Sequence, residues 1–176
     1  GSRTSYQSIA KQVDAGSHPI ARQYLEILEG CYAVIVAERL NPKTGRGTLK
    51  KEKKFYFLDP LVMSALVSWA RAGQVVPSWL TEAMTDPVLQ GTCFENLVAG
   101  ELRKRGLEFF YEERMGQEID FVFKREPVVE NGQWGAWECK RSMPSPGDLV
   151  GLESYRDAHC LVLQKDSLRP FSGRSK

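Results

Sequence analysis

The sequence predicts a mixed α/β fold in which a small helix-and-hairpin unit (residues 3–59) and a helical connector (60–91) precede an αβββαβ unit (92–170). Apolar spacing changes along the chain between the helical period of 3.6 and the strand period of 2. Clusters of Gly, Pro and Asn separate the periodic stretches. The 176 residues are 42% hydrophobic and 26% charged, which is typical of a folded globular chain.

Two short helices are expected at the start of the chain. Apolar residues recur at helical spacing in two sets, first Tyr6, Ile9, Ala10 and Val13, then Ile20, Tyr24, Leu25, Ile27 and Leu28. Gly16 separates the two sets, and we expect the hydroxyl of Ser17 to cap the second helix. Pro19 suits the first turn of that helix.

A basic β-hairpin is expected next. Residues 31–36 and 54–58 are β-branched and aromatic, and the Pro and Gly residues between them favour a turn. Six basic residues and one acid crowd this turn; the basic ones are Lys43, Arg46, Lys50, Lys51, Lys53 and Lys54. The cluster either binds phosphate or forms a solvated tip.

Helices followed by a two-stranded wing are typical of a winged helix. In that arrangement the second helix enters the major groove of DNA and the wing contacts phosphates. Arg22 on the second helix and the six basic hairpin residues would then bind nucleic acid. The same architecture also serves as a protein-interaction module, and this alternative stays open.

The second region has a clear order of elements. A helix over residues 92–105 is expected to end at Gly106. Strands are expected at residues 107–111, 118–123, 134–140 and 159–163, with a further helix starting at Gly147-Asp148 and turning Leu149, Leu152 and Tyr155 inward.

Charged residues interrupt two of these strands. Alternation places Ile119, Phe121 and Phe123 on one face and Asp120 on the other; it separates Trp137 and Cys139 from Glu138 and Lys140 in the same way. An ionised group in an apolar strand is costly unless it is paired or binds a cation. The pattern therefore indicates a site, with exposed sheet faces and an incidental Glu-x-Lys ion pair as the alternative.

With Glu95 in the preceding helix, these residues resemble the signature of the restriction-endonuclease-like nuclease superfamily. That signature is a helix Glu, then Asp, then Asp/Glu-x-Lys, on an αβββαβ core; here the residues are Glu95, Asp120, Glu138 and Lys140. Ile119 stands where the superfamily often has Pro. More narrowly, residues 5–165 resemble the C-terminal region of predicted bacterial and archaeal AAA+ class ATPases, through Lys54-Phe55-Tyr56-Phe57-Leu58-Asp59 and the segments FEN, EIDFV and E-x-K.

The resemblance implies a metal-dependent DNA nuclease that forms the C-terminal part of an ATPase. Asp120, Glu138 and the Cys139 carbonyl would hold Mg²⁺ or Mn²⁺, with Glu95 reaching the metal directly or through water. Lys140 would orient the attacking water or stabilise the transition state. The alternative is a non-catalytic nucleic-acid-binding or regulatory module of that ATPase.

Partners and location follow from what the sequence contains. The resemblance implies that an ATPase domain lies N-terminal to this chain. The sequence itself has no phosphate-binding Gly-rich motif, so we expect it to bind no nucleotide. Its longest apolar stretch, Cys31 to Ala37, is too short to span a membrane, and no secretory leader opens it. Four widely spaced cysteines among apolar neighbours indicate buried, reduced thiols in the cytoplasm and no zinc site.

The predicted site also requires a particular strand register. A two-residue turn at Asn131-Gly132 would pair Asp120 with Met143, away from Glu138. A wider loop centred near Val129, or an irregularity at Pro127, is needed to bring Asp120 beside Glu138.

Overall fold

A computed structural model describes residues 3–70, 85–114, 116–124, 134–155, 157–164 and 167–171. Its helices are α1 (Tyr6–Gln12), α2 (His18–Gly30), α3 (Pro60–Ala70), α5 (Pro87–Lys104) and α6 (Pro146–Leu149), with a 3-10 turn η1 (Leu152–Ser154). Its strands are β1 (Arg3–Thr4), β2 (Val34–Asn41), β3 (Arg46–Phe57), β4 (Phe109–Arg114), β5 (Gln117–Lys124), β6 (Trp134–Lys140), β7 (Asp157–Gln164) and β8 (Ser167–Phe171). Residues 71–84 of the expected connector lie outside the described residues.

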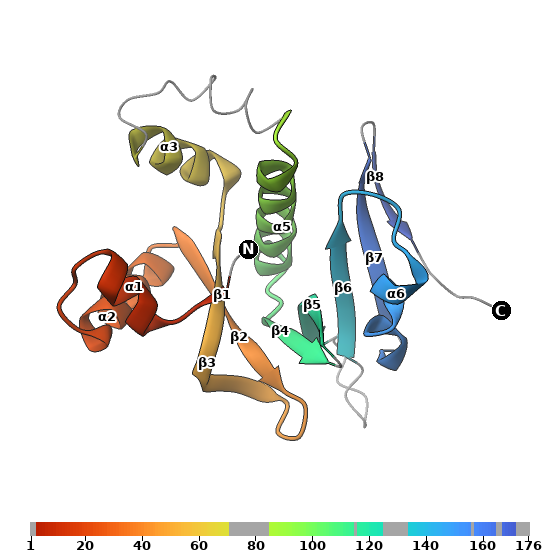
Figure 1. The fold of residues 1–176 in the computed structure, drawn as a ribbon, viewed down its shortest axis with the longest axis horizontal. Coiled ribbons are helices and arrows are strands. Elements are labelled where there is room, and N and C mark those ends of the chain that lie inside the picture. The colour runs from red at the N-terminus through yellow and green to blue at the C-terminus, as the bar shows by residue number, and fades with distance from the viewer. Residues whose placement is uncertain are drawn as a thin grey trace.

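The described strands form one mixed sheet in the order β1-β3-β2-β4-β5-β6-β7-β8 (Figure 1). The β2–β4 and β6–β7 pairs are parallel, and the other pairs are antiparallel. A parallel contact of Arg39 with Tyr111 joins the basic hairpin, made of β2, β3 and their turn, to the C-terminal strands. The expected hairpin is confirmed, and it continues the sheet of the second region.

The first two helices begin where the sequence indicates. Ser5 caps α1, its hydroxyl accepting a hydrogen bond from the Ser8 N–H at 3.1 Å. Ser17 holds the cap position of α2, with Pro19 in the first turn, but its hydroxyl makes no capping hydrogen bond. The predicted boundary is confirmed and the predicted capping contact is wrong.

The apolar residues of α2 and α3 mostly face outward. Tyr24 and Ile27 of α2 are 63% and 55% exposed, whereas the small Ala21 is buried. On α3, Trp69 is 79% exposed, and the inward side carries Met63. The apolar spacing identified the helices, but it did not identify the face that packs against the protein.

The C-terminal region has the predicted order of elements. Helix α5 starts earlier than expected, at Pro87, because Asp86 caps it through hydrogen bonds from the Val88 and Leu89 N–H groups. Gly106 ends it with a positive φ of 72°, as predicted. The second helix is reduced to α6 and η1, and β8 was not predicted.

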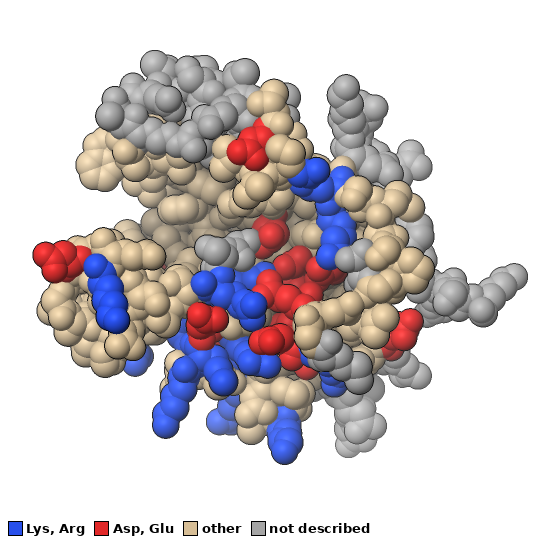
Figure 2. All heavy atoms as spheres, viewed as in Figure 1, with Lys and Arg blue, Asp and Glu red and all other residues tan. Residues whose placement is uncertain are grey.

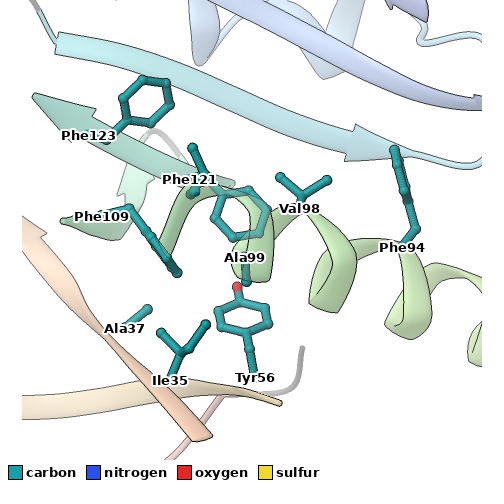
Figure 3. Close-up of a cluster of buried hydrophobic side chains, with 10 residues drawn as sticks. Ile35, Ala37, Tyr56, Phe94, Val98, Ala99, Phe109, Phe121 and Phe123 are labelled. Atoms are coloured by element: carbon teal, nitrogen blue, oxygen red, sulfur yellow. The ribbon is translucent and has the colours of Figure 1, made fainter. Parts of the chain in front are cut away.

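Two apolar cores cover the two faces of the sheet. On one face, Phe94, Val98 and Ala99 of α5 pack against Tyr56 and Phe121 (Figure 3). The core on the other face includes Ile119, Val122 and Leu152, with Leu149 and Tyr155 packed against it. The predicted inward direction of Leu149, Leu152 and Tyr155 is confirmed.

Helix α5 and strand β3 are held close together. Asn96, which is buried, accepts a hydrogen bond from the Phe57 N–H at 2.6 Å and donates one to the Thr92 carbonyl at 2.7 Å. A Cβ atom at Gly100 would lie 2.5 Å from the Leu58 carbonyl oxygen. A glycine at position 100 is therefore required by backbone contact.

Replacing Gly100 with Ala should destabilise the protein by about 1–3 kcal/mol, because the added methyl group forces α5 away from Leu58. Gly30→Ala is the matched control: it also lies in a helix, and a Cβ there meets nothing within 4 Å. Urea denaturation followed by circular dichroism measures both changes. Equal stability of the two variants would contradict the close approach.

Two further expectations concern membranes and thiols. No described helix is long and apolar enough to cross a membrane. Cys160 is buried as expected, but Cys31 is exposed. The expectation that every cysteine is buried is wrong at Cys31, which directly follows the exposed end of α2.

Candidate functional site

The predicted carboxylates Asp120 and Glu138 meet where the pairing of β5 and β6 ends. The ladder runs from Lys124↔Trp134 to Phe121↔Trp137. Asp120 and Glu138 each lie one residue beyond this last pair. The Cys139 N–H donates to Asp120 Oδ2 at 2.9 Å, and the Asp120 N–H donates to Glu138 Oε2 at 3.2 Å. Each carboxylate thus binds the backbone of the neighbouring strand.

The observed register is the one that the site requires. Lys124 pairs with Trp134 and Phe121 with Trp137, a register in which Asp120 is opposite Glu138 and not Met143. The loop centre predicted near Val129, the irregularity predicted at Pro127 and the turn considered at Asn131-Gly132 all fall within residues 125–133, which connect β5 to β6. The connection itself lies outside the described residues.

A β-bulge in β5 lies directly at Asp120. Phe110 pairs with Val122 and Glu112 with Ile119, so β5 uses one residue more than β4 over this interval. As a result, Ile119 packs in a different core from Phe121. The prediction that these two residues share a face is wrong, because a bulge interrupts the alternation and redirects the side chains around it.

Lys54 of β3 lies against the Asp120 side chain. Its ammonium is 2.7 Å from Asp120 Oδ1, 2.5 Å from Glu118 Oε1 and 3.8 Å from Glu95 Oε2. The side chain is 1% exposed. Burial lowers the pKa of Lys54, but the negative charge of Asp120 and its neighbours more than compensates, so the pKa lies above its ordinary value.

Glu95 approaches Lys54 and Asp120 from helix α5. It projects from α5, next to the Asn96 that fixes this helix to β3. Burial and then the nearby charge of Asp120 raise the pKa of Glu95 above its ordinary value. The helix carboxylate predicted from the sequence therefore lies within electrostatic reach of Asp120.

Glu138 and Lys140 form a second group beside the first. The Lys140 ammonium lies 3.1 Å from Glu138 Oε1. Glu138 is 7% exposed, and burial followed by the charge of Asp120 raises its pKa to about 8. Two buried carboxylates with this mutual repulsion mark a place that a cation would stabilise.

The four predicted residues are connected through Asp120. Glu95 and Asp120 approach through Lys54, and Asp120 connects to Glu138 and Lys140 through the backbone. Within the described part of the chain, no three His, Cys, Asp or Glu residues are grouped to hold a metal ion. The oxygen chemistry of Asp120 and Glu138 fits Mg²⁺ or Mn²⁺, which protein sites often hold through one or two carboxylates and several waters.

The basic residues of the hairpin divide into two groups. Glu38 and Arg39 are consecutive residues of β2, and they pair with Lys53 and Thr48 of β3. Residues 49–52 of β3 therefore have no partner on β2 and form a bulge. Lys50 and Lys51 lie in this bulge and are exposed, as are Lys43 and Arg46 near the turn. On the face shown in Figure 2, Lys and Arg side chains border a central group of acidic side chains along the hairpin.

Lys53 and Lys54 differ from the other four basic residues of the hairpin, with which they were predicted to bind nucleic acid. Both are 1% exposed. The Lys53 ammonium donates to the Leu49 and Lys51 carbonyls at 2.9 and 3.2 Å, so it satisfies the backbone of the bulge, whereas Lys54 belongs to the carboxylate group. Arg22 lies on α2 and pairs with Glu26 at 2.7 Å, which offsets its charge.

Sequence reasoning missed two members of the site. Glu118 binds Lys54 and lies 3.0 Å from Arg3 Nε of β1. It precedes Asp120 by two residues, a spacing that places two side chains on one face of a regular strand, and this was the available signal. Lys54 was predicted to bind nucleic acid and was noted at the start of the Lys-x-Tyr-Phe-x-Asp segment, but its position among the carboxylates was not predicted.

Residues 90–173 match the model of a family described as "Domain of unknown function (DUF4143)". The match starts within α5, extends past β8 and includes Glu95, Asp120, Glu138 and Lys140; the hairpin and Lys54 lie outside it. No curated protein and no solved structure matches the chain. The comparison thus covers most of the second region and assigns it no activity.

Proposed function

We propose that this chain is a nuclease-type module that hydrolyses phosphodiester bonds of DNA. The observation that supports it most is the meeting of Asp120 and Glu138 at the end of the β5–β6 ladder, with Lys140 3.1 Å from Glu138. Acidic residues on neighbouring strands followed by a lysine are the residue types that this chemistry needs. The direct test is metal-dependent DNA cleavage by the parent and by Asp120→Asn.

Each residue of the site has a role in this proposal. Asp120 and Glu138 would hold Mg²⁺ or Mn²⁺, with the Cys139 carbonyl and Glu95 as further ligands, Glu95 directly or through water. A bound metal supplies a water of lowered pKa and neutralises charge on the phosphate. Lys140, held by Glu138, positions the attacking water or stabilises negative charge on the phosphate in the transition state.

The exposed cations of the hairpin would supply affinity for the DNA backbone. Lys43, Arg46, Lys50 and Lys51 are exposed at or near the turn and the bulge of β3. Contacts between such residues and phosphates release counterions and depend on salt but not on base sequence. We therefore propose non-specific binding, with selection of the DNA form left to other surfaces.

Replacing Lys50 and Lys51 with Gln should weaken duplex binding and reduce the log-log salt slope by up to about 1.8, since each phosphate contact contributes about 0.9. Arg103→Gln with Lys104→Gln is the matched control, because these two cations are exposed on the last turn of α5. Fluorescence anisotropy over a salt series measures both slopes. An unchanged salt slope in the variant with Lys50→Gln and Lys51→Gln would show that these lysines are solvated and do not contact phosphate.

The cellular setting of the proposal comes from the family resemblance. The chain would act in the cytoplasm as the C-terminal part of an AAA+ class ATPase, and the ATPase domain would bind the nucleotide. The second candidate is a non-catalytic interaction module of that ATPase. The outward-facing Tyr24, Ile27 and Trp69 favour it, because exposed apolar side chains often mark interaction surfaces.

A further inference from the structure

Lys54 is held rigidly among acids. Its ammonium lies within 3 Å of both Asp120 and Glu118, and Glu95 is 3.8 Å away. Strand β3 is itself fixed on both sides, since Lys54 pairs with Ala37 of β2 and with Arg3 of β1. The position of this cation is thus set by the sheet.

The contacts of Lys54 make it a positioning residue and not a catalytic one. An ammonium group has three donors. Two of them face Asp120 and Glu118, and the side chain is 1% exposed. The ammonium is therefore engaged by carboxylates and shielded from solvent.

A metal at Asp120 and the ammonium of Lys54 would repel each other. Mg²⁺ binds carboxylate oxygen at about 2.1 Å. With Lys54 2.7 Å from Asp120 Oδ1, a metal on the same oxygen would lie at most about 5 Å from the ammonium. Like charges this close inside a protein repel strongly.

We infer that Lys54 is the resident cation of the site: it neutralises Asp120 in the metal-free protein and competes with divalent metal for that carboxylate. The inference rests on the proposed function, because it concerns the metal that the proposed reaction uses. It extends the site to the hairpin, outside residues 90–173. It also predicts weak metal binding by the parent protein.

Calorimetric titration with Mn²⁺ tests the competition. We expect Lys54→Met to bind Mn²⁺ at least about tenfold more tightly than the parent, because removing a nearby like charge favours a second cation. Lys53→Met is the matched control, a buried neighbour whose ammonium binds backbone carbonyls, and it should bind Mn²⁺ as the parent does. Equal or weaker binding by Lys54→Met would overturn the inference.

Thermal melting covers the case in which Lys54→Met folds poorly. Without metal, this variant should melt below the parent, because buried acids lose their counter-charge. Mn²⁺ should raise its melting temperature by more than it raises that of the parent. A variant that stays unfolded in saturating Mn²⁺ would contradict the inference. Lys54→Arg keeps the charge and should retain the metal affinity of the parent; tight binding by the Arg variant would also count against it.

The outcomes separate this inference from the proposed function. Cleavage by the parent together with equal Mn²⁺ affinities of the parent and Lys54→Met would remove only the inference. Tighter Mn²⁺ binding by Lys54→Met with no cleavage by either protein would support the inference and remove the proposed reaction. Absence of Mn²⁺ binding from both proteins would overturn both.

Discussion

Asp120→Asn should lose metal-dependent DNA cleavage by at least about 100-fold, because a metal contributes several kcal/mol of transition-state stabilisation and 1.36 kcal/mol corresponds to tenfold. Asn keeps the shape of Asp and can still accept the hydrogen bond from the Cys139 N–H. The loss would therefore report the charge and not the fold. A gel assay on linear, branched and single-stranded DNA with Mn²⁺ measures it, and circular dichroism checks folding.

Lys140→Ala separates the role of the lysine from metal binding. We expect cleavage to be lost while Mn²⁺ affinity is kept or raised, because the change removes a cation beside Glu138. Asp120→Asn should instead weaken Mn²⁺ binding. Glu153→Gln, an exposed change on η1, is the control for both.

Two results would count against the assignment. A parent protein inert on every DNA form would favour the interaction module, in which case Asp120→Asn could strengthen DNA binding by removing negative charge. Cleavage by Asp120→Asn at the level of the parent would place the activity in another site or in a contaminant.

The metal-free protein should lose about 3 kcal/mol of stability between pH 5 and pH 8, because Glu138 has a pKa raised from 4.5 to about 8 by burial and by Asp120. Over this range the folded state binds a proton that the unfolded state has released. The contribution of Glu138 to stability is therefore fully present below its unfolded pKa of 4.5 and is lost as the pH rises through about 8. The raised pKa of Glu95 acts in the same direction.

Chemical denaturation in EDTA at pH 5, 6.5 and 8 measures this dependence. Glu138→Gln cannot ionise at this position and should give a clearly shallower pH profile. Glu108→Gln, which changes a carboxylate between α5 and β4 that lies outside the site, is the control and should keep the slope of the parent. A rise in stability from pH 5 to pH 8, or an unchanged slope in Glu138→Gln, would contradict the raised pKa.

The sequence predicted most elements of the second region, because α5 and strands β4 to β7 each have a strong local signal. Strand β6 starts at Trp134 and ends at Lys140, as expected from its apolar alternation. Gly106 ends α5 because a glycine readily adopts the positive φ found there. The register of β5 against β6 could not be predicted from local signals, because it depends on the length of the connection between the two strands. The sequence showed only which register a site at Asp120 and Glu138 would require.

The remaining features depend on partners that are distant in sequence. Lys54 belongs to a charge run, which indicates solvent exposure, yet it is buried because Glu118 and Asp120 bind it. The bulge at Asp120 arises from pairing with β4, and no Gly or Pro marks it in β5. One parallel contact between Arg39 and Tyr111 joins the hairpin to the sheet, and a contact of one residue pair leaves no periodic pattern.

The position of Lys54 on β3 constrains how this protein can evolve. A recombination event that joined a different N-terminal segment to residues 90–173 would bring together Asp120 and Glu118 without the ammonium that binds them here. Such a chimaera would need a compensating loss of the acids or a replacement cation. The hairpin and the carboxylate strands should therefore be inherited as one unit, and substitutions at positions 54, 118 and 120 should covary among descendants.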